Sequence, residues 1–324
     1  MAIETKRISW WKDFEWHLTH VKVKQTGTII RFDLSLIHDL VRWLLYAAIE
    51  RSRNLFKTNK ITTYATPKPP RYWYLLSVTL SRLGVKYVSH PDEAKLALHF
   101  VDDTYIENDN APAIANDAKR INFDCLDISK SQVQSTFYEV FGYELKVDPQ
   151  NYDGPIVVKT ELNGAHSGKI LHGPVEAETG YVYQKLIDNR SKYGVTDLRC
   201  PTVFGQIPFI YLKSRPESYR FDNFNSHVDL VPPDGFLSPE ELRLISQFCA
   251  KMKLDWGGLD ILRHRHDGKI YIVDVNKTDM GPPLSLPLLK KLKSTTLLAK
   301  ALKTGLEIKC QPKTEPNITK LIQS

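Results

Sequence analysis

The sequence predicts an α+β fold, and three observations indicate it. The 324-residue chain is 42% hydrophobic and 25% charged, which is typical of a globular protein long enough for two or three domains. Helical and strand patterns are mixed in the first half, whereas the second half, from Pro155 onward, is rich in short strand patterns with one clear helix. Together these observations favour an N-terminal α/β domain followed by two strand-rich domains over a doubly wound parallel sheet.

Composition narrows the class of protein. The chain has no uncharged apolar stretch of about 18 residues and no apolar signal segment near its start, so we expect a cytoplasmic protein. Its four cysteines are far apart and lack metal-ligand spacing, so we expect them to be reduced and structural. The net charge of +7 indicates an anionic partner: a nucleotide, an acidic substrate, nucleic acid or a lipid surface.

Residues 1–60 form a basic extension, with 11 Lys/Arg against 6 Asp/Glu. Apolar residues at helical spacing predict an amphipathic helix over Leu36 to Glu50, and the basic stretch Arg51 to Lys60 follows it. We expect this helix to pack against the body of the protein in preference to a membrane surface or a partner.

Residues 61–121 read as an N-terminal α/β domain. After the Pro-rich stretch Thr66 to Pro70, the patterns predict a helix over Tyr72–Leu83 and strands over Lys86–Val88 and Leu96–Val101. Asp102 and Asp103 close the last strand, and we interpret them as an acidic turn instead of a metal site.

Residues 122–190 and 191–324 read as two further, strand-rich units. A helix is predicted over Ser131–Phe141, with Asp127 or Ser129 as its cap and Gly142 as its stop, and a second helix over Pro239–Met252. Residues 290–324 form a basic tail with 8 Lys against 2 Glu. Strands are predicted over Ile156–Thr160, Tyr181–Ile187, Asp197–Val203, Phe209–Lys213, Gly258–Leu262 and Lys269–Asn276.

The last two predicted strands form a hairpin that carries a candidate metal site. Asp274 and Asn276 are two residues apart on one strand, so both leave the same face. A three-residue turn with Gly268 left-handed would place Asp260 directly opposite Asp274. A two-residue turn would pair Asp260 with Val275 instead and send it to the other face, so the register decides the site. Two carboxylates and a carboxamide suit Mg²⁺, although solvated polar residues on an open sheet face are the alternative.

A lysine at a strand end indicates a phosphate site. Lys159 lies at the end of the predicted strand Ile156–Thr160 and precedes a loop, Glu161 to Lys169, that contains Gly164, so its charge and the loop amides could bind phosphate. The loop is not a Walker A motif, because it is one residue too short and has Ile170 in place of Ser or Thr.

Charged residues also recur at i, i+2 spacing on two neighbouring strands. Asp197 and Arg199 form one pair, and Lys213 and Arg215 form the other. Each pair alone is typical of a surface charge set.

Taken in their order along the chain, these motifs resemble the ATP-grasp superfamily, which includes D-alanine:D-alanine ligase and glutathione synthetase. The resemblance covers about half of the chain, Asn122 to Pro283, and it implies an ATP-grasp fold in which two strand-rich domains enclose ATP. It departs from the family in two places: the loop lacks an adjacent glycine pair, and Asp274 stands where Glu is commoner. The resemblance implies that ATP is bound by Lys130, Lys159, Gly164, His166, Ser167, Gln184, Lys185, Leu186, Ile187 and Asp188; that Arg199, Lys213 and Arg215 act on the transferring phosphoryl group; and that Asp260, Asp274 and Asn276 hold Mg²⁺, with Mn²⁺ as a substitute.

The activity that the resemblance implies is an ATP- and Mg²⁺-dependent carboxylate-amine ligase. An anionic small molecule or peptide would be activated as an acylphosphate and captured by an amine. One alternative is an ATP-grasp kinase that phosphorylates a hydroxyl, with His166 orienting the acceptor. Another is a basic protein that binds nucleic acid or a membrane surface, although the core lacks the interleaved basic and aromatic pattern of a nucleic-acid site.

Overall fold

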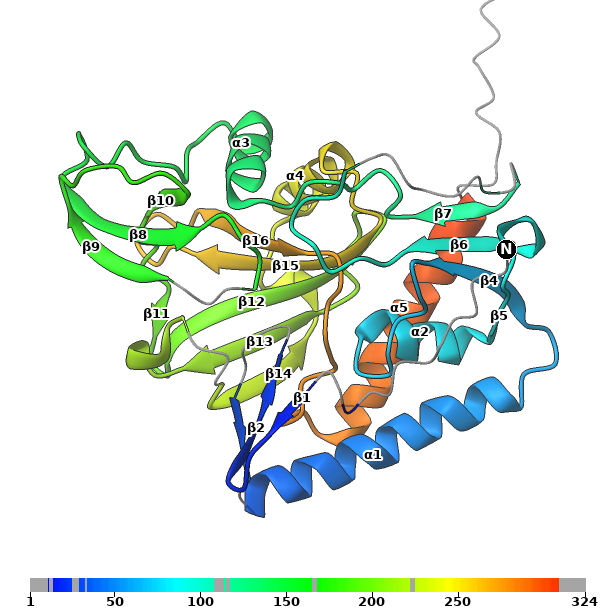
Figure 1. Ribbon diagram of the computed structural model, residues 1–324. Helices are drawn as coiled ribbons and strands as arrows, with labels where there is room; N and C mark the ends of the chain where they lie inside the picture. The colour runs from blue at the N-terminus through cyan, green and yellow to red at the C-terminus, as the bar shows by residue number, and fades with distance from the viewer. Residues whose placement is uncertain are drawn as a thin grey trace, which may run out of the picture.

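The structure, a computed structural model, describes residues 11, 14–24, 29–32, 34–107, 114, 117–164, 168–221 and 225–308. It confirms the α+β class: a parallel sheet, two antiparallel sheets around the candidate site and a small antiparallel N-terminal sheet are arranged with five α-helices (Figure 1).

The N-terminal region contains a small sheet and a long helix. Strands β1 (Phe14–Trp16), β2 (His20–Val23) and β3 (Ile29–Arg31) form an antiparallel sheet, and β3 leads into α1 (Leu34–Leu55). The predicted helix is therefore confirmed and extends further at both ends. Helix α1 packs against α2 (Leu75–Leu83) and α5 (Leu288–Ile308), where Tyr46 Oη lies 2.5 Å from Thr295 Oγ1.

The second region is a parallel sheet with the order β5-β4-β6-β7. Its strands are β4 (Ile61–Thr66), β5 (Val85–Tyr87), β6 (Leu96–His99) and β7 (Lys119–Ile121), and a short 3-10 turn, η2 (Pro91–Glu93), connects β5 to β6. Helix α5 was not predicted, because its lysines led us to interpret the region as a basic tail. Its leucines Leu298, Leu302 and Leu306 are buried in the core that α2 shares.

The largest sheet is antiparallel throughout, which agrees with the predicted α+β character of the second half. The strand order is β14-β13-β12-β15-β16, and β11 pairs with β12. The strands are β11 (Arg190–Ser191), β12 (Gly194–Val203), β13 (Ile210–Arg215), β14 (His227–Val231), β15 (Trp256–Arg263) and β16 (Ile270–Asn276), with 3-10 turns η4 (Glu217–Tyr219) and η5 (Pro233–Gly235). Of these, β14 and the two-residue β11 were not predicted.

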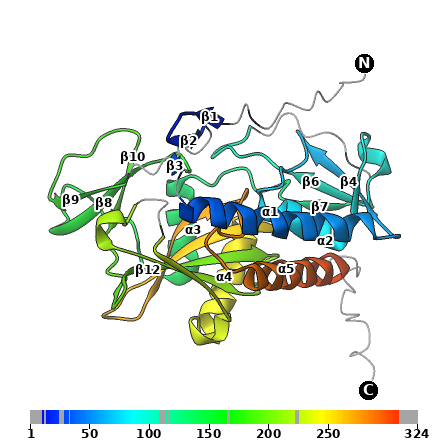
Figure 2. The same cartoon turned by 90° about the horizontal axis from the view of Figure 1, so that it is seen from below.

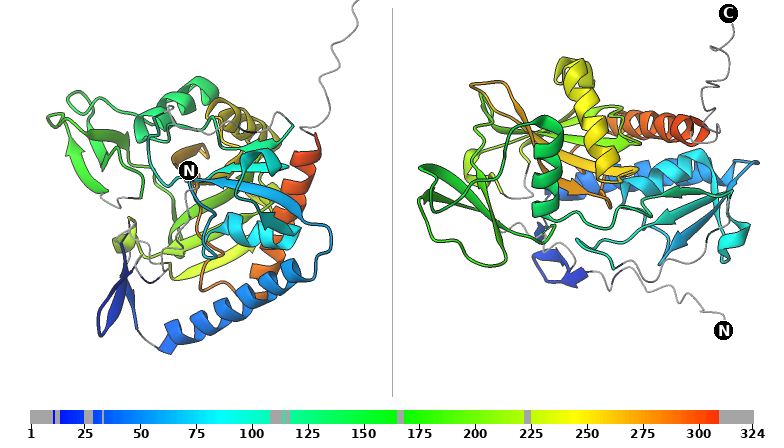
Figure 3. Two further views of the ribbon diagram at one scale, coloured as in Figure 1. Left: turned by 45° about the vertical axis from the view of Figure 1, so that its right-hand side comes forward. Right: turned by 90° about the horizontal axis from the view of Figure 1, so that it is seen from above.

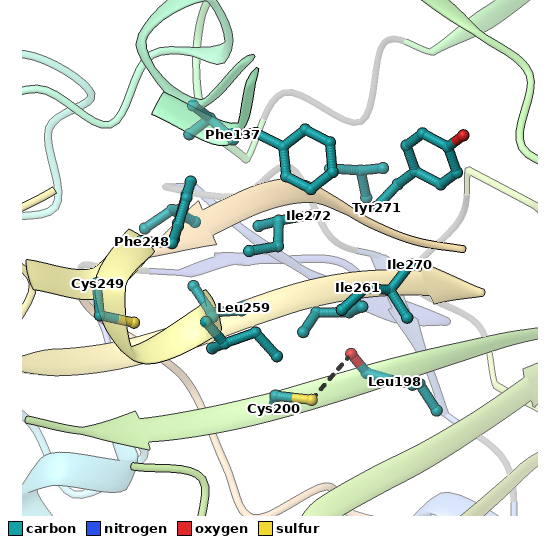
Figure 4. Packing of buried hydrophobic residues seen from close by; sticks show 14 of the residues in the cluster. Phe137, Leu198, Cys200, Phe248, Cys249, Leu259, Ile261, Ile270, Tyr271 and Ile272 are labelled. Atoms are coloured by element: carbon teal, nitrogen blue, oxygen red, sulfur yellow. Dashed lines mark hydrogen bonds between the residues drawn. The ribbon is translucent and has the colours of Figure 1, made fainter. Parts of the chain in front are cut away.

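Two helices, α3 (Lys130–Phe141) and α4 (Pro239–Lys251), cover one face of this sheet, as Figure 3 shows from above. Ser129 caps α3 by accepting a hydrogen bond from the Gln132 amide at 3.3 Å, and left-handed Gly142 ends it, as predicted. Figure 4 shows Phe137 of α3 and Phe248 of α4 packed over Ile272 and Leu259. This shared core holds β15 and β16 in place.

The remaining sheet is smaller. Strands β8 (Gly154–Thr160), β9 (Lys169–Gly173) and β10 (Tyr181–Lys185) are antiparallel in the order β10-β8-β9. Their own core is a cluster of four buried hydrophobic residues: Val147, Ile156, Val158 and Tyr183. In Figure 1 this sheet stands beside the ends of β11 and β12, apart from the main core.

Cys125, Cys200 and Cys249 are buried free thiols, in agreement with the prediction, and Cys310 lies outside the described residues. Among the residues that the structure describes, no helix is long and apolar enough to cross a membrane.

Candidate active site

A cavity of about 190 Å³ lies between the sheet formed by β8, β9 and β10, called the small sheet below, and the sheet formed by β11 to β16, called the large sheet. Six basic side chains and three carboxylates line it, so its wall carries a cationic excess that suits an anionic ligand. The basic residues are Lys130, Lys159, Lys185, Lys213, Arg215 and Arg220, and the carboxylates are Asp197, Asp260 and Asp274.

The small sheet contributes a lysine and a buried glutamine. Lys159 pairs with Val182, and Gln184 pairs with Val157, two residues further along the same ladder. Gln184 is buried, and its Nε2 has no hydrogen-bond partner among the described residues, although it lines the cavity. A buried, unsatisfied amide is costly, so this donor indicates a ligand acceptor in the cavity.

The surroundings of Lys159 favour the binding of an anion beside its ammonium group. Burial lowers the pKa of its ammonium group, while the Asp274 carboxylate acts in the opposite direction and Lys130 adds to the lowering. Burial likewise lowers the pKa of Lys213 on β13, with Arg199 acting in the same direction. A polyanion bound in the cavity would relieve both shifts.

The large sheet contributes the two facing carboxylates. Asp260 on β15 lies directly opposite Asp274 on β16, as predicted, and Gly268 has a φ of 70°. The reason differs from the predicted three-residue turn. Arg263 pairs with Ile270 and His264 N donates to Lys269 O, so four residues form the loop, and a bulge at Val273 restores the phase at Asp274.

Asp274 holds a lysine from α3. Lys130 Nζ lies 2.9 Å from Asp274 Oδ1, and the lysine is buried in the first turn of α3. A cation at a helix N-terminus is unfavourable, because the helix dipole is positive there. Its burial beside a carboxylate in this cavity is therefore better explained by a role in the site than by helix stability.

Asp260 is held by Arg199, which bridges two carboxylates. Arg199 Nη1 donates to Asp260 Oδ2 at 2.8 Å, and Nη2 donates to Asp279 Oδ1 at 2.7 Å. Burial alone would raise the pKa of Asp260, but Arg199 and Lys213 outweigh it and hold that pKa below its usual range. A Cβ at Gly258 would lie 2.4 Å from Asp279 Oδ2 and 2.9 Å from Arg199 Nε, so glycine is required under this pair.

A third group lies at the β12–β13 end. Asp197 forms an ion pair with Arg215 and accepts a hydrogen bond from Asn189 Nδ2 at 2.8 Å. Arg220 Nη1 donates to Asn189 Oδ1 at 2.6 Å. Burial raises the pKa of Asp197, although the nearby Arg215 opposes this shift. These contacts anchor the guanidinium groups at the wall of the cavity.

The structure brings most of the predicted site residues together. The predicted residues that line the cavity are Lys130, Lys159, Gly164, Gln184, Lys185, Leu186, Ile187, Lys213, Arg215, Asp260 and Asp274. His166 and Ser167 lie outside the described residues.

Three predicted residues do not line the cavity. Asp188 accepts hydrogen bonds from the Arg190 side chain, both at 2.8 Å, and its neighbour Asn189 lines the cavity instead. Arg199 lies behind Asp260, as described above. Asn276 Oδ1 accepts from the Thr278 amide at 2.8 Å.

Several lining residues were not predicted, among them Asp197 as a wall residue, Arg220, Phe221 and Asn225. Arg220 and Phe221 follow the short turn η4, where the sequence has no periodic signal. The one available signal was the pair of charged i, i+2 patterns on β12 and β13, because Asp197 lies opposite Lys213 in that ladder and forms its ion pair with Arg215.

The donors present fit a magnesium ion in part. Asp260 and Asp274 face each other across the ladder and both line the cavity, which gives two hard oxygen donors and leaves room for phosphate oxygens. No group of three His, Cys, Asp or Glu residues suited to a metal occurs among the described residues, so a third ligand would have to be water, or Asn276 if its side chain turned from Thr278 toward the cavity.

No protein-family model matches the chain, and no curated protein sequence matches it. Solved structures do match. The ATP-grasp ligase PsnB, complexed with a minimal precursor, is 16% identical over 55% of this chain and 60% of its own, with a TM-score of 0.39. The chain therefore spans about 60% of the length of that ligase.

Two further structures are matched over nearly their whole length. D-alanine–D-alanine ligase from Bacillus anthracis, complexed with ATP, is 12% identical over 76% of this chain and 98% of its own, with a TM-score of 0.44. A RimK domain ATP-grasp protein from Sphaerobacter thermophilus is 11% identical over 76% of this chain and 99% of its own, with a TM-score of 0.46. These structures belong to the superfamily that the sequence resembles.

Proposed function

We propose that this chain is an ATP-grasp ligase that binds ATP and Mg²⁺ in the cavity and activates a carboxylate for attack by an amine. The single observation that carries the proposal is the lining of the cavity. Residues 130–274 place six basic groups, two facing carboxylates and the unsatisfied Gln184 amide around one space. Adenine, phosphates and a divalent ion each require one of these features.

In this proposal the nucleotide lies between residues 122–190 and 191–324. Gln184, Lys185, Leu186 and Ile187 contact the adenine, and the buried Gln184 amide supplies the hydrogen bond. Lys130 and Lys159 bind the phosphates from two sides. Asn189, not Asp188, is the cavity-facing polar residue at the end of this segment.

Asp260 and Asp274 would hold Mg²⁺, with Asn276 or water completing the ion's shell and Mn²⁺ as a substitute. When bound, the ion neutralises charge on the phosphates. Arg199 pairs with Asp260 and keeps that carboxylate ionised, while Lys130 pairs with Asp274 at the cavity wall.

The reaction needs positioning and charge neutralisation, not a protein nucleophile. The acceptor carboxylate oxygen attacks the γ-phosphorus, and ADP leaves. The amine nitrogen then attacks the acyl carbon and loses a proton, and phosphate leaves. Lys213 and Arg215 lie in the cavity wall beside Asp197 and Asp260, where they can stabilise the transferring phosphoryl group.

The acceptor is proposed to be an anionic small molecule or a peptide. PsnB was solved with a minimal precursor, and a Chryseobacterium gregarium ATP-grasp ligase with ADP and a leader and core peptide. A peptide carboxylate is therefore included among the acceptors to be tested.

A phosphate-release screen tests the proposal. The purified chain is incubated with ATP, Mg²⁺ and pairs of carboxylates and amines, including peptides. We expect ADP and phosphate in equal amounts only when both acceptors are present, and a large loss of turnover in Asp274→Asn. A stable phosphorylated hydroxyl product without phosphate release would support a kinase instead. Absence of nucleotide binding would refute both activities.

A further inference from the structure

Helix α1 exposes a continuous aliphatic face. The side chains of Ile37, Val41, Leu44 and Leu45 are between 51% and 60% exposed. Their spacing places them on one side of the helix, one turn above another. Figure 2, seen from below, shows α1 in front of the neighbouring helices, so among the described residues this side is an outer surface of the molecule.

The opposite side of α1 attaches it to the protein. Tyr46 and Glu50 are fully buried against α2 and α5. Glu50 accepts a hydrogen bond from Arg82 Nε of α2 at 2.9 Å. These contacts already anchor the helix, and among the described residues the aliphatic face does not serve internal packing.

Basic residues gather at the C-terminal end of this helix. Arg51, Arg53 and Lys57 are exposed, and Lys57 and Arg53 line an open hollow together with Arg82. The acidic neighbour, Glu50, is buried and already paired with Arg53 and Arg82. Because two arginines share the single Glu50 carboxylate and Arg51 and Lys57 lie beside them, the aliphatic stripe ends in a net positive charge.

The hairpin before α1 extends the same apolar character. Leu18, in the turn between β1 and β2, is fully exposed, and Trp16 is 56% exposed. Phe32, between β3 and α1, is also exposed. Tryptophan combines an apolar ring with a polar N–H, a chemistry suited to the boundary between lipid and water.

We propose that α1 and the preceding hairpin dock onto an anionic membrane surface. Aliphatic side chains would enter the acyl boundary while Arg51 and Lys57 contact lipid phosphates. A second copy of this face would offer the basic residues no anionic counterpart, whereas an anionic lipid surface complements both the stripe and the charge. A bound peptide would favour a groove, whereas this surface is a projecting helix. From the sequence, packing against the protein and contact with a membrane are alternatives for this helix. The two are compatible, because one side of α1 packs against the protein and the opposite side is exposed.

The test is cosedimentation of the full chain with lipid vesicles. We expect binding to vesicles of phosphatidylcholine containing roughly one third phosphatidylglycerol, little binding to phosphatidylcholine alone, and weakening at high salt. The double variant Val41→Glu/Leu44→Glu should reduce binding at least about tenfold. Lys57→Gln should reduce it about fivefold at low salt. The matched control is Tyr138→Glu, an exposed apolar residue on α3, which should bind as wild type does.

Circular dichroism and thermal unfolding verify that each variant is folded, which is expected because Val41 and Leu44 are more than half exposed. Unchanged vesicle binding by the double variant would overturn the proposal and assign any binding to another part of the chain. Equal binding to neutral vesicles would overturn the role of charge. A concentration-dependent dimer that the double variant abolishes, without vesicle binding, would make this face a self-association surface instead.

Discussion

The two sheets around the candidate site differ in how firmly the chain holds them. Strands β15 and β16 of the large sheet pack against helices α3 and α4 through a large hydrophobic core. The small sheet, β8 to β10, has a separate core of only four buried hydrophobic residues among those described. The carboxylates proposed for Mg²⁺ lie on the first sheet, and Lys159 and Gln184 lie on the second. In the proposed function, the large sheet would therefore supply the firmly held carboxylates, and the β8–β10 sheet would supply nucleotide contacts from a less firmly packed support.

The largest expected effect is on the large sheet. Asp274→Asn should reduce phosphoryl transfer on the order of a thousandfold, because it removes a charged ligand of the ion. ATP binding should weaken much less. Because Lys130 then loses its carboxylate partner, we expect a slight loss of stability. Phosphate release and thermal unfolding measure the two effects, and normal magnesium-dependent turnover would remove Asp274 from the site.

A pair of core truncations tests the difference in support directly. Ile261 and Ile156 are both fully buried, one in each sheet. Ile261→Ala should lower the free energy of unfolding by about 3 kcal/mol. Ile156→Ala should lower the free energy of the main unfolding transition by less than about half of that amount. It should instead reduce the hydrogen-exchange protection of the amides in β8 and β10. Equal losses in denaturant unfolding, with uniform hydrogen exchange, would show that the two sheets unfold as one unit.

Lys159→Met should weaken ATP binding about tenfold to a hundredfold while leaving the fold intact. The methionine keeps the apolar stem but removes the charge. Lys169→Met is the matched control, because Lys169 is an exposed lysine of the same sheet outside the cavity lining. Calorimetric titrations in which both variants bind ATP equally would exclude Lys159 from the site.

The smallest effect concerns protons. Burial lowers the pKa of Lys159 in the free protein, and phosphate would raise it. Between the free and bound pKa values, ATP binding should therefore take up a fraction of a proton, and the affinity should fall as pH rises through that window. Below the free pKa the lysine is already charged, and the uptake should vanish. Titrations in buffers of different ionisation enthalpy should show a smaller uptake in Lys159→Met, and an identical uptake would assign it to other groups.

Those helices and strands that are encoded by a short local pattern could be predicted from the sequence. The cap and stop of α3, Ser129 and Gly142, and the short apolar runs of β15 and β16 are local signals. Helix α5 was missed although its leucines have helical spacing, because its lysines were given more weight than its buried face.

The Asp260–Asp274 pairing was predicted correctly from an incorrect turn. A four-residue loop shifts the ladder by one residue, and the bulge at Val273 shifts it back. Such a cancellation depends on packing of the two strands and leaves no signal in a single sequence. The same limit applies to Arg220 and Asn189, which reach the cavity through tertiary contacts between β13, η4 and the end of β10.

The central claim is that the cavity is a magnesium–nucleotide site, and a calorimetric titration of the wild-type chain with ATP tests it most directly. With Mg²⁺ present we predict one saturable site, and removal of the ion with a chelator should weaken it at least about tenfold. ATP affinity that is unchanged by the chelator, or no detectable binding under either condition, would contradict the account.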